Sequence, residues 1–200
     1  MRKITVLAMI SLDGVIQSPG SSEEDPENDF KLGGWVAPYW DEIGDKATTE
    51  ELTQTTDFML GRKTFEIWEN YWPKHYDRWA GISEGTKYIF SDTRDNSDWK
   101  NSAFIKTLAE LKSLKATDGP DFHIWGSSEL VHLLLENNLI DELRLKIYPI
   151  ILGKGKKLFP EGALPAAFKL KSSSVTGTGV ILANYEREGE VKTRDIEEQM

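Results

Sequence analysis

One stretch constrains the fold more than any other: residues 121 to 159, DFHIWGSSELVHLLLENNLIDELRLKIYPIILGKGKKLF. A short apolar run that ends at Gly126 predicts a buried strand and a tight turn. Leucines at helical spacing follow, and Asn137–Asn138 ends that helix before an alternating segment from Leu143 to Ile147 predicts a half-buried strand. The apolar run contains Phe122, Ile124 and Trp125, and the spaced leucines are Leu130, Leu133, Leu134 and Leu139.

The glycine turn between this strand and this helix is the chemically informative part of the unit. Backbone N–H groups in the first turn of a helix have no partner within the helix, and the helix dipole adds positive potential there. Such a turn is a site for a phosphate or a pyrophosphate. The same residues also fit an ordinary strand–helix–strand packing unit, so the segment alone leaves both interpretations open.

A second strand–glycine–helix junction lies at residues 57–64, with the sequence DFMLGRKT. Here Arg62 and Lys63 stand in the first helical turn, directly after Gly61. Because cations oppose the dipole at a helix N-terminus, their presence predicts a bound anion. The planar fork of an arginine suits phosphate. A solvated basic turn is the alternative.

The length and composition of the chain suit one globular domain. It has 200 residues, of which 39% are hydrophobic. We predict a single domain over residues 1–188 and a charged, frayed tail over residues 189–200. The formal net charge of −9 argues against nucleic acid as a partner, because a protein that binds the phosphate backbone needs a basic face.

Other classes of protein and site are also disfavoured. No apolar run approaches the roughly 20 residues of a membrane helix, so no membrane partner is expected. The absence of cysteine excludes thiolate catalysis and cysteine metal sites, and it fits a cytoplasmic location. The three histidines are not clustered, so no metal site is predicted.

Strand and helix patterns alternate along most of the chain and end in a hairpin. This order predicts an α/β domain with a mostly parallel sheet and an antiparallel edge. In such sheets ligands bind at the carboxyl ends of the strands. Gly14, Gly61, Ser91 and Gly126 all fall at such ends, so one crevice is expected to gather these four loops. The predicted strands are 3–10, 57–61, 87–90, 121–125, 143–147, 168–175 and 180–185.

A long acidic loop, residues 17–34, separates the first strand from a group of aromatic residues. Trp35, Tyr39 and Trp40 lie close together in sequence, and aromatic side chains beside a loop often line an apolar ligand pocket. They are candidate substrate-binding residues for a flat, conjugated ring. The alternative is that they anchor the loop to the core.

Five pieces of the chain carry a family resemblance. In order they are ITVLAMISLDGVI, LGRKTFE, YIFSDT, IWGSSEL and LIDELRLKIYPIILGKGKKLF, between residue 4 and about residue 159. Together they resemble the dihydrofolate reductase-like superfamily, and within it the reductase domain at the C-terminus of the bacterial bifunctional riboflavin deaminase-reductase and its stand-alone relatives. The resemblance implies a three-layer α/β/α fold.

The same resemblance implies an activity. It points to an NADPH-dependent reductase that transfers a hydride to a small conjugated heterocycle, either pterin-like or similar to a riboflavin precursor. A non-catalytic nucleotide-binding sensor or assembly module is the alternative. The family likeness, together with the nearly continuous apolar run from Leu143 to Leu152, also predicts a two-fold homodimer.

The resemblance places the cofactor at both glycine turns. Ser127 stands where dihydrofolate reductases usually have a second glycine, and Asp92 stands where a small hydroxyl favours a 2′-phosphate. In the implied arrangement Gly61, Arg62, Lys63 and Thr64 meet the adenosine phosphates, Ser91 lies by the adenosine ribose, Gly126, Ser127, Ser128, Glu129 and Leu130 wrap the pyrophosphate, and Ala8, Met9 and Ile16 border the nicotinamide.

Two residues are implied as the catalytic pair. Counting back from Gly61 at the family spacing reaches Asp45, and Lys146 falls where the family places the partner of that carboxylate. A carboxylate beside a lysine stays ionised, which suits substrate orientation better than proton donation. The alternative is that Asp45 is one charge on a solvated helix face and that water supplies the proton.

Overall fold

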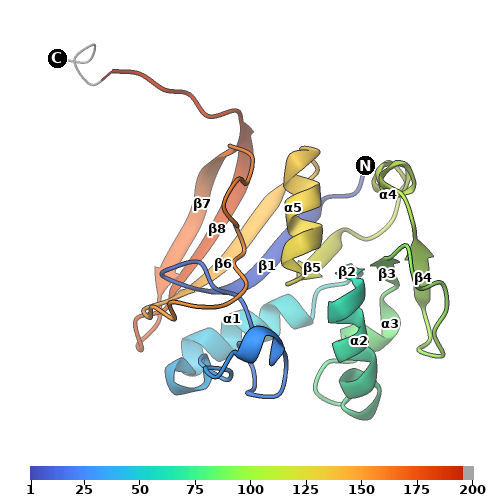
Figure 1. Ribbon diagram of the computed structural model, residues 1–200, viewed down its shortest axis with the longest axis horizontal. Coiled ribbons are helices and arrows are strands. Elements are labelled where there is room, and N and C mark those ends of the chain that lie inside the picture. Colours follow the sequence, from blue (N-terminus) through green and yellow to red (C-terminus); the bar gives the residue numbers. More distant parts are fainter. Residues whose placement is uncertain (196–200) are drawn as a thin grey trace.

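A computed structural model describes residues 1–195, so the last five residues of the predicted tail lie outside the described part of the chain. Its centre is an eight-stranded sheet with the order β4-β3-β2-β5-β1-β6-β8-β7 (Figure 1). The strands are β1 Ile4–Ser11, β2 Asp57–Gly61, β3 Lys87–Phe90, β4 Ser102–Ile105, β5 Phe122–Trp125, β6 Glu142–Tyr148, β7 Ala167–Val175 and β8 Ile181–Gly189.

The sheet is mostly parallel, as predicted. β1 through β6 pair in parallel, whereas β8 runs antiparallel to β6 and forms a hairpin with β7. Residues 1–195 form the helices α1 Glu42–Leu52, α2 Arg62–Tyr71, α3 Ala80–Glu84, α4 Leu108–Lys115 and α5 Ser128–Glu136, and the short 3-10 turns η1 Glu27–Asp29, η2 Ala37–Tyr39 and η3 Trp72–Lys74.

Helices cover both faces of the sheet, which confirms the three-layer prediction. Alternate residues of β2 show this layering: Met59 packs into the core beneath α4 and α5, whereas Phe58 and Leu60 pack beneath α2 and α3. α1 lies on the same face as α2, over β6. In residues 1–195 no helix combines the length and the apolar character that a membrane crossing needs.

Two elements differ from the sequence prediction. The edge strand β4 is absent from the predicted strands; it forms because the main-chain carbonyl of Asn101 accepts a hydrogen bond from the Lys87 amide and starts a ladder. In α1 the apolar residue Ile43 does not face the core and is 47% exposed. The reason is that α1 packs over the polar side chains of β6, so Gly44 and Thr48 face the sheet instead.

Asp13 ties the loop after β1 to the loop after β6. Its carboxylate accepts hydrogen bonds from the backbone amides of Leu152 (3.1 Å) and Gly153 (2.8 Å) and from the Ser11 hydroxyl (2.6 Å). Burial acts to raise the pKa of Asp13, but these hydrogen bonds outweigh it and lower that pKa to about 2. The ionised carboxylate thus holds two strand ends together.

We predict that Asp13→Asn destabilises the protein at neutral pH by about 1–2 kcal/mol, since it removes charge-assisted hydrogen bonds at a partly exposed site. A folded-state pKa of about 2 lies below the ordinary value of 3.8, so this stabilisation exists above pH 3.8 and is lost as the pH falls toward 2. Urea unfolding at pH 7 and pH 3 checks this. A difference in the free energy of unfolding between wild type and Asp13→Asn that is the same at both pH values would contradict the prediction.

Candidate functional site

Two strand–helix junctions lie side by side at the carboxyl edge of the sheet. β2 pairs with β5 in parallel, which brings Gly61 and Gly126 to the same edge. A Cβ atom built on Gly61 would lie 2.0 Å from the Ser127 Oγ, so the two turns touch. β3, which pairs with β2 on its other side, brings Ser91 to this edge too. Three of the four predicted loops therefore lie along one edge of the sheet, and their sharing of one crevice stays a prediction.

The helices that begin at these turns have no side-chain caps. Neither α2, which starts after Gly61, nor α5, which starts after Ser127, receives a capping hydrogen bond from its N-cap side chain. Gly126 and Ser127 both have left-handed backbone, with φ of +79° and +72°, a conformation that glycine adopts freely and serine does not. The uncapped first turns leave backbone N–H groups suited to an anion.

The two cations of the α2 turn contact carboxylates. The Arg62 guanidinium donates to both carboxylate oxygens of Glu66 at 2.9 Å, and the Lys63 ammonium donates to Glu27 of the acidic loop at 2.8 Å. Arg62 and Lys63 were predicted to hold a phosphate, and in the structure both cations already pair with carboxylates of the protein. An incoming anion must compete with Glu66 and Glu27.

Negative charge surrounds Arg62 more widely. The hydrogen bond that Arg62 donates to Glu66 raises the pKa of Arg62 above its usual value, and the charges of Glu129 and Asp92 contribute to the same rise. Asp92, which follows β3, thus lies near enough to act on the guanidinium. The effect of Asp92 on a 2′-phosphate stays a prediction.

The remaining residues predicted to bind the cofactor differ in solvent exposure. Ser91 is 5% exposed, and its hydroxyl accepts from the backbone amides of Thr93 (3.3 Å) and Arg94 (3.1 Å), so it stabilises its own turn. Leu130 is 3% exposed and belongs to the core. In the first helical turns Thr64 and Ser128 are half-buried and Glu129 is exposed.

The predicted nicotinamide residues lie on β1 and just after it. Ala8 packs into the core beneath α5, whereas Met9 points to the opposite face and packs in the cluster around Tyr148. Ile16, which follows the turn after β1, packs against the same core cluster as Ala8. Met9 is directly beside Lys146 in the parallel ladder, so β1 connects the glycine turns with the predicted catalytic lysine.

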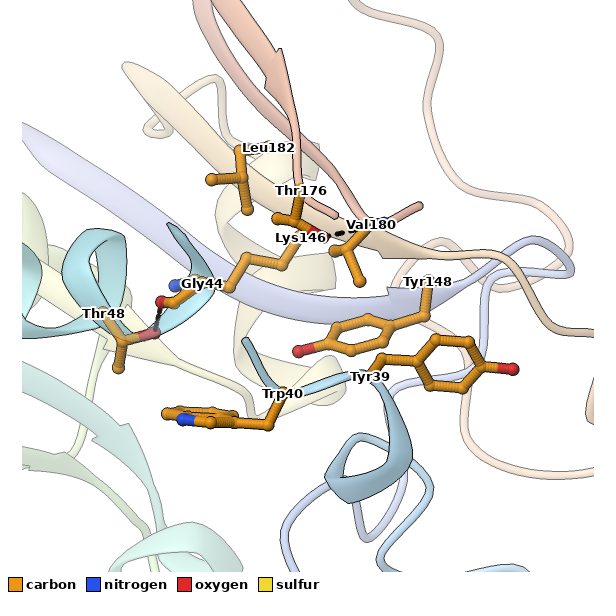
Figure 2. A pocket seen from close by; sticks show the side chains of 9 residues that line it. All are labelled: Tyr39, Trp40, Gly44, Thr48, Lys146, Tyr148, Thr176, Val180 and Leu182. Carbon is orange, nitrogen blue, oxygen red and sulfur yellow. Dashed lines mark hydrogen bonds between the residues drawn. The ribbon is translucent and has the colours of Figure 1, made fainter. Parts of the chain in front are cut away.

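A narrow pocket of about 10 Å³ lies beyond Lys146, between α1, η2 and the hairpin strand β8 (Figure 2). A space of this size holds about one water molecule. Tyr39, Trp40 and Tyr148 form an aromatic group at one end of it (Figure 2). The full lining is Tyr39, Trp40, Gly44, Thr48, Lys146, Tyr148, Thr176, Val180 and Leu182.

The structure does not bring Asp45 to Lys146. Asp45 is exposed on α1, and the Lys146 ammonium is paired with Glu51. The side chains of Lys146 and Glu51 are only 7% and 12% exposed. Family spacing predicted the right helix but the wrong helical phase, because Gly44, Thr48 and Glu51 share the face toward the sheet.

Two of the three predicted aromatic residues line the pocket. Tyr39 and Trp40 do so, and Trp40 is 48% exposed at its mouth. Trp35 does not: it is 6% exposed, its indole N–H donates to the Gln17 carbonyl at 2.8 Å, and its ring packs edge-on against Tyr148. Trp35 therefore anchors the acidic loop, which was the alternative interpretation.

Sequence reasoning missed three side chains. Glu51 could have been found from its helical spacing with Gly44 and Thr48. Tyr148 alternates with Lys146 on β6, and burial raises the pKa of its phenol to about 12, so the hydroxyl stays protonated at neutral pH. Trp125 ends β5 just before the glycine turn.

Trp125 carries an unusual polar group. Its indole Nε1 is buried and has no hydrogen-bond partner in the described part of the chain. The Lys146 ammonium lies 5.4 Å from the centre of its ring, and the Trp79 ring packs edge-on against it with the two ring centres 5.5 Å apart. The indole therefore lies between the glycine turn and Lys146 and offers an unused donor there.

A larger polar depression of about 380 Å³ lies at the opposite, amino edge of the parallel strands. Neighbouring groups hold its charged side chains: Lys3 pairs with Glu142 at 2.7 Å, Arg144 donates to Gln54 at 3.0 Å, and Asp121 accepts from the backbone amide of Lys3 at 2.6 Å. Burial lowers the pKa of His123 on its floor to about 4, with Arg144 adding to the effect, so this imidazole is neutral at physiological pH. The depression is separate from both glycine turns.

Similarity to solved structures supports the fold. A putative riboflavin biosynthesis protein from Shewanella sp. PV-4 matches with a TM-score of 0.71 and 18% identity, over 93% of this chain and 99% of that one. Dihydrofolate reductase from Enterococcus faecalis, complexed with NADP(H) and RAB-propyl, matches with a TM-score of 0.62 and 16% identity, over 93% and 96%. A pyrimidine reductase-like protein from Corynebacterium diphtheriae gives 0.61 and 16%, over 97% and 93%.

Sequence relatives span nearly the whole chain. The uncharacterized protein YyaP of Bacillus subtilis (strain 168) is 28% identical over 200 residues, which cover 94% of this chain and 96% of that protein. The uncharacterized protein YwjB of the same organism is 27% identical over 183 residues, covering 90% and 96%. The family model described as RibD C-terminal domain matches residues 2–182. With its mixed eight-stranded sheet and paired glycine turns, the chain belongs to the RibD C-terminal domain family, whose fold is that of dihydrofolate reductase.

Proposed function

We propose that this chain is an NADPH-dependent reductase that transfers a hydride to a small conjugated heterocycle, pterin-like or similar to a riboflavin precursor. Its family and its fold are those of reductases. We also propose the cytoplasm as its compartment, which a chain without cysteine fits.

One observation carries the proposal: the two uncapped helix N-termini touch at Gly61 and Ser127, at the carboxyl edge of the sheet. Two adjacent sets of free N–H groups suit the linked phosphates of a dinucleotide. The bound cofactor would supply the hydride from its nicotinamide ring. The path from these turns along β1 leads to Met9 and then Lys146, where a substrate ring is expected.

The chain's own residues would bind and orient that ring. Lys146, held by Glu51, presents an ammonium that stabilises negative charge left on a ring nitrogen or oxygen after hydride addition. The protonated Tyr148 phenol and the Trp125 indole N–H are further donors on the same face. Trp40, at 48% exposed, must move to admit a ring, because the pocket holds only about one water molecule.

The proposal is tested by cofactor binding and turnover. NADPH should raise the melting temperature, because a ligand that binds only the folded state stabilises it. The decay of NADPH absorbance would then be followed with a panel of pterins, flavin precursors and conjugated imines. No thermal shift with millimolar NADPH or NADH would sink the proposal.

A nucleotide-binding sensor without catalysis is the second candidate. The small pocket favours it, since about 10 Å³ has no room for a substrate ring in the present conformation. Thermal stabilisation by NADPH without oxidation on any member of the panel would support the sensor. Oxidation that depends on Lys146 would exclude it.

We further propose a homodimer built on the C-terminal hairpin. Three apolar side chains on the α5 side of this hairpin support it: Leu170 is 49% exposed, Val175 61% and Ile181 40%. Exposed apolar patches of this kind mark interfaces. Light scattering should give twice the chain mass of 22.7 kDa, and Leu170→Lys with Val175→Lys should give monomers. A wild-type mass of one chain at high concentration would contradict the dimer.

A further inference from the structure

The tip of the C-terminal hairpin holds the chain segment that carries Trp40. The Thr178 hydroxyl donates to the Tyr39 carbonyl at 2.6 Å, and the Thr178 amide donates to the Asp41 carboxylate at 3.1 Å. Tyr39 and Asp41 are the two neighbours of Trp40 in the chain. One residue of the hairpin therefore contacts the chain on both sides of Trp40.

The Asp41 carboxylate also links this contact to α1. Its Oδ1 atom accepts from the Gly44 amide at 2.8 Å and caps α1, while Oδ2 faces the amide and the hydroxyl of Thr178, at 3.1 and 3.4 Å. The hydrogen bond from Gly44 and those from Thr178 lower the pKa of Asp41, although desolvation opposes them. The carboxylate is therefore ionised at neutral pH and accepts hydrogen bonds from both elements.

The hairpin tip is fixed by its own hydrogen bonds. The Thr176 hydroxyl oxygen accepts from the Val180 amide at 3.2 Å and hydrogen-bonds the Thr178 hydroxyl at 3.0 Å. Thr176 and Val180 are 5% and 3% exposed, and Figure 2 shows them on the other side of Lys146 from Trp40. The hairpin is thus a firm support for the segment that it holds.

The Trp40 segment is the less anchored partner. Trp40 and Asp41 form an extended connection between η2 and α1, and Trp40 is 48% exposed. The pocket beside Trp40 has room for about one water molecule, and the side chain of Lys146 within it is 7% exposed. A ring therefore reaches Lys146 only after the Trp40 segment moves.

We infer that Thr178 is a positioning residue for Trp40: its hydrogen bonds hold the indole at the mouth of the pocket, and a ring reaches Lys146 only when they break. That the ring is a substrate rests on the proposed function. Each of these hydrogen bonds contributes little net free energy, because water replaces it when it opens. The open form is then a minor population in exchange with the closed one.

The test measures how fast trinitrobenzenesulfonate labels Lys146, because this flat aromatic ring must pass Trp40 to reach the amine. Peptide mass spectrometry of samples taken over time gives a rate for each lysine. Thr178→Val keeps the amide and the volume but loses the hydroxyl, so it should raise the Lys146 rate roughly three- to tenfold, the range of one lost hydrogen bond. Thr178→Ser keeps the hydroxyl and should match wild type. Glu51 pairs with Lys146 in every variant, so the ratio of rates reports access.

Two controls separate local opening from general loss of stability. Lys115 of α4, on the other face of the sheet, has a side chain that is 9% exposed and pairs with Asp141, and its labelling rate should not change. Thr117→Val is the matched variant, because the Thr117 hydroxyl also donates to a main-chain carbonyl, that of Leu114, at 2.7 Å. It should leave the Lys146 rate unchanged.

Trp40→Ala tests the gate itself. It should raise the Lys146 rate at least as much as Thr178→Val does, and Thr178→Val should add nothing in that background, since the indole is already gone. No increase from Thr178→Val or from Trp40→Ala, an equal increase at Lys115, equal rates for Thr178→Val and Thr178→Ser, or additive effects in the double variant would each overturn the inference.

The two proposals fail in distinguishable ways. Labelling needs no cofactor, so it decides about Thr178 even if neither NADPH nor NADH shifts the melting temperature, an outcome that ends the reductase proposal. NADPH binding together with an unchanged Lys146 rate in Thr178→Val would keep the reductase proposal and overturn the role of Thr178.

Discussion

Replacing Glu51 with leucine should lower the free energy of unfolding by about 3 kcal/mol, because it leaves a buried charge without its counterion. The charge is that of Lys146, which is 6% exposed beneath α1. Urea denaturation measures the loss. The control is Glu50→Leu on the next residue, whose carboxylate is 66% exposed and 4.0 Å from Lys46, and which should cost less than about 0.5 kcal/mol. Equal losses from the two variants would contradict the buried pair.

The double variant Glu51→Leu, Lys146→Met separates stability from function. Removing both partners with residues of similar volume should restore most of the stability, since a well-packed apolar pair replaces two desolvated charges. It should not restore reductase turnover, because the ammonium beside the pocket is gone. Recovery of both stability and turnover would remove Lys146 from the proposed mechanism.

Gly61→Val should destabilise the protein by about 2–3 kcal/mol and abolish the thermal shift caused by NADPH, because overpacking forces the two glycine turns apart. A Cβ at this position would lie 2.0 Å from the Ser127 Oγ and 3.2 Å from its Cβ. The backbone itself tolerates a side chain, as Gly61 has φ −74° and ψ 157°. The cost is therefore the clash alone.

A second substitution should relieve the clash that a Cβ atom at position 61 creates. Ser127→Gly removes both clashing atoms and also suits the left-handed φ of +72° at that position. Gly61→Ala with Ser127→Gly should accordingly be close to wild type in stability and in NADPH binding. Gly20→Val is the control, because its Cβ would meet only the far end of the Glu24 side chain. If this double variant stays destabilised or fails to bind NADPH, the cost of a side chain at position 61 has a cause other than the clash with Ser127.

The turns and the sheet could be predicted because their signals are local. Gly61 and Gly126 follow short apolar strands, and each strand end must come to one edge once the strands pair in parallel. The hairpin was equally visible, since Thr176 to Gly179 breaks two alternating segments. These features depend on neighbours in sequence.

The pairing of Lys146 with Glu51 beside the pocket could not be predicted, because it depends on the helical phase of α1. A shift of one residue on α1 rotates a side chain by about 100°, which separates the exposed Asp45 from the inward-facing Gly44. The apolar Ile43 is likewise exposed, because α1 packs on Lys146 and its polar neighbours. Glu27 pairs with Lys63 and Lys156, which are 36 and 129 positions away from it in the sequence, and no local sequence pattern predicts such pairs.

Hydrogen exchange of the backbone amides, with and without NADPH, shows whether the two glycine turns bind the cofactor. We expect slower exchange at residues 61–65 and 126–131 with NADPH, because the uncapped N–H groups of α2 and α5 would bond the phosphates. Protection confined to residues 54–56 and 142–144, which border the depression at the opposite edge of the sheet, would contradict it.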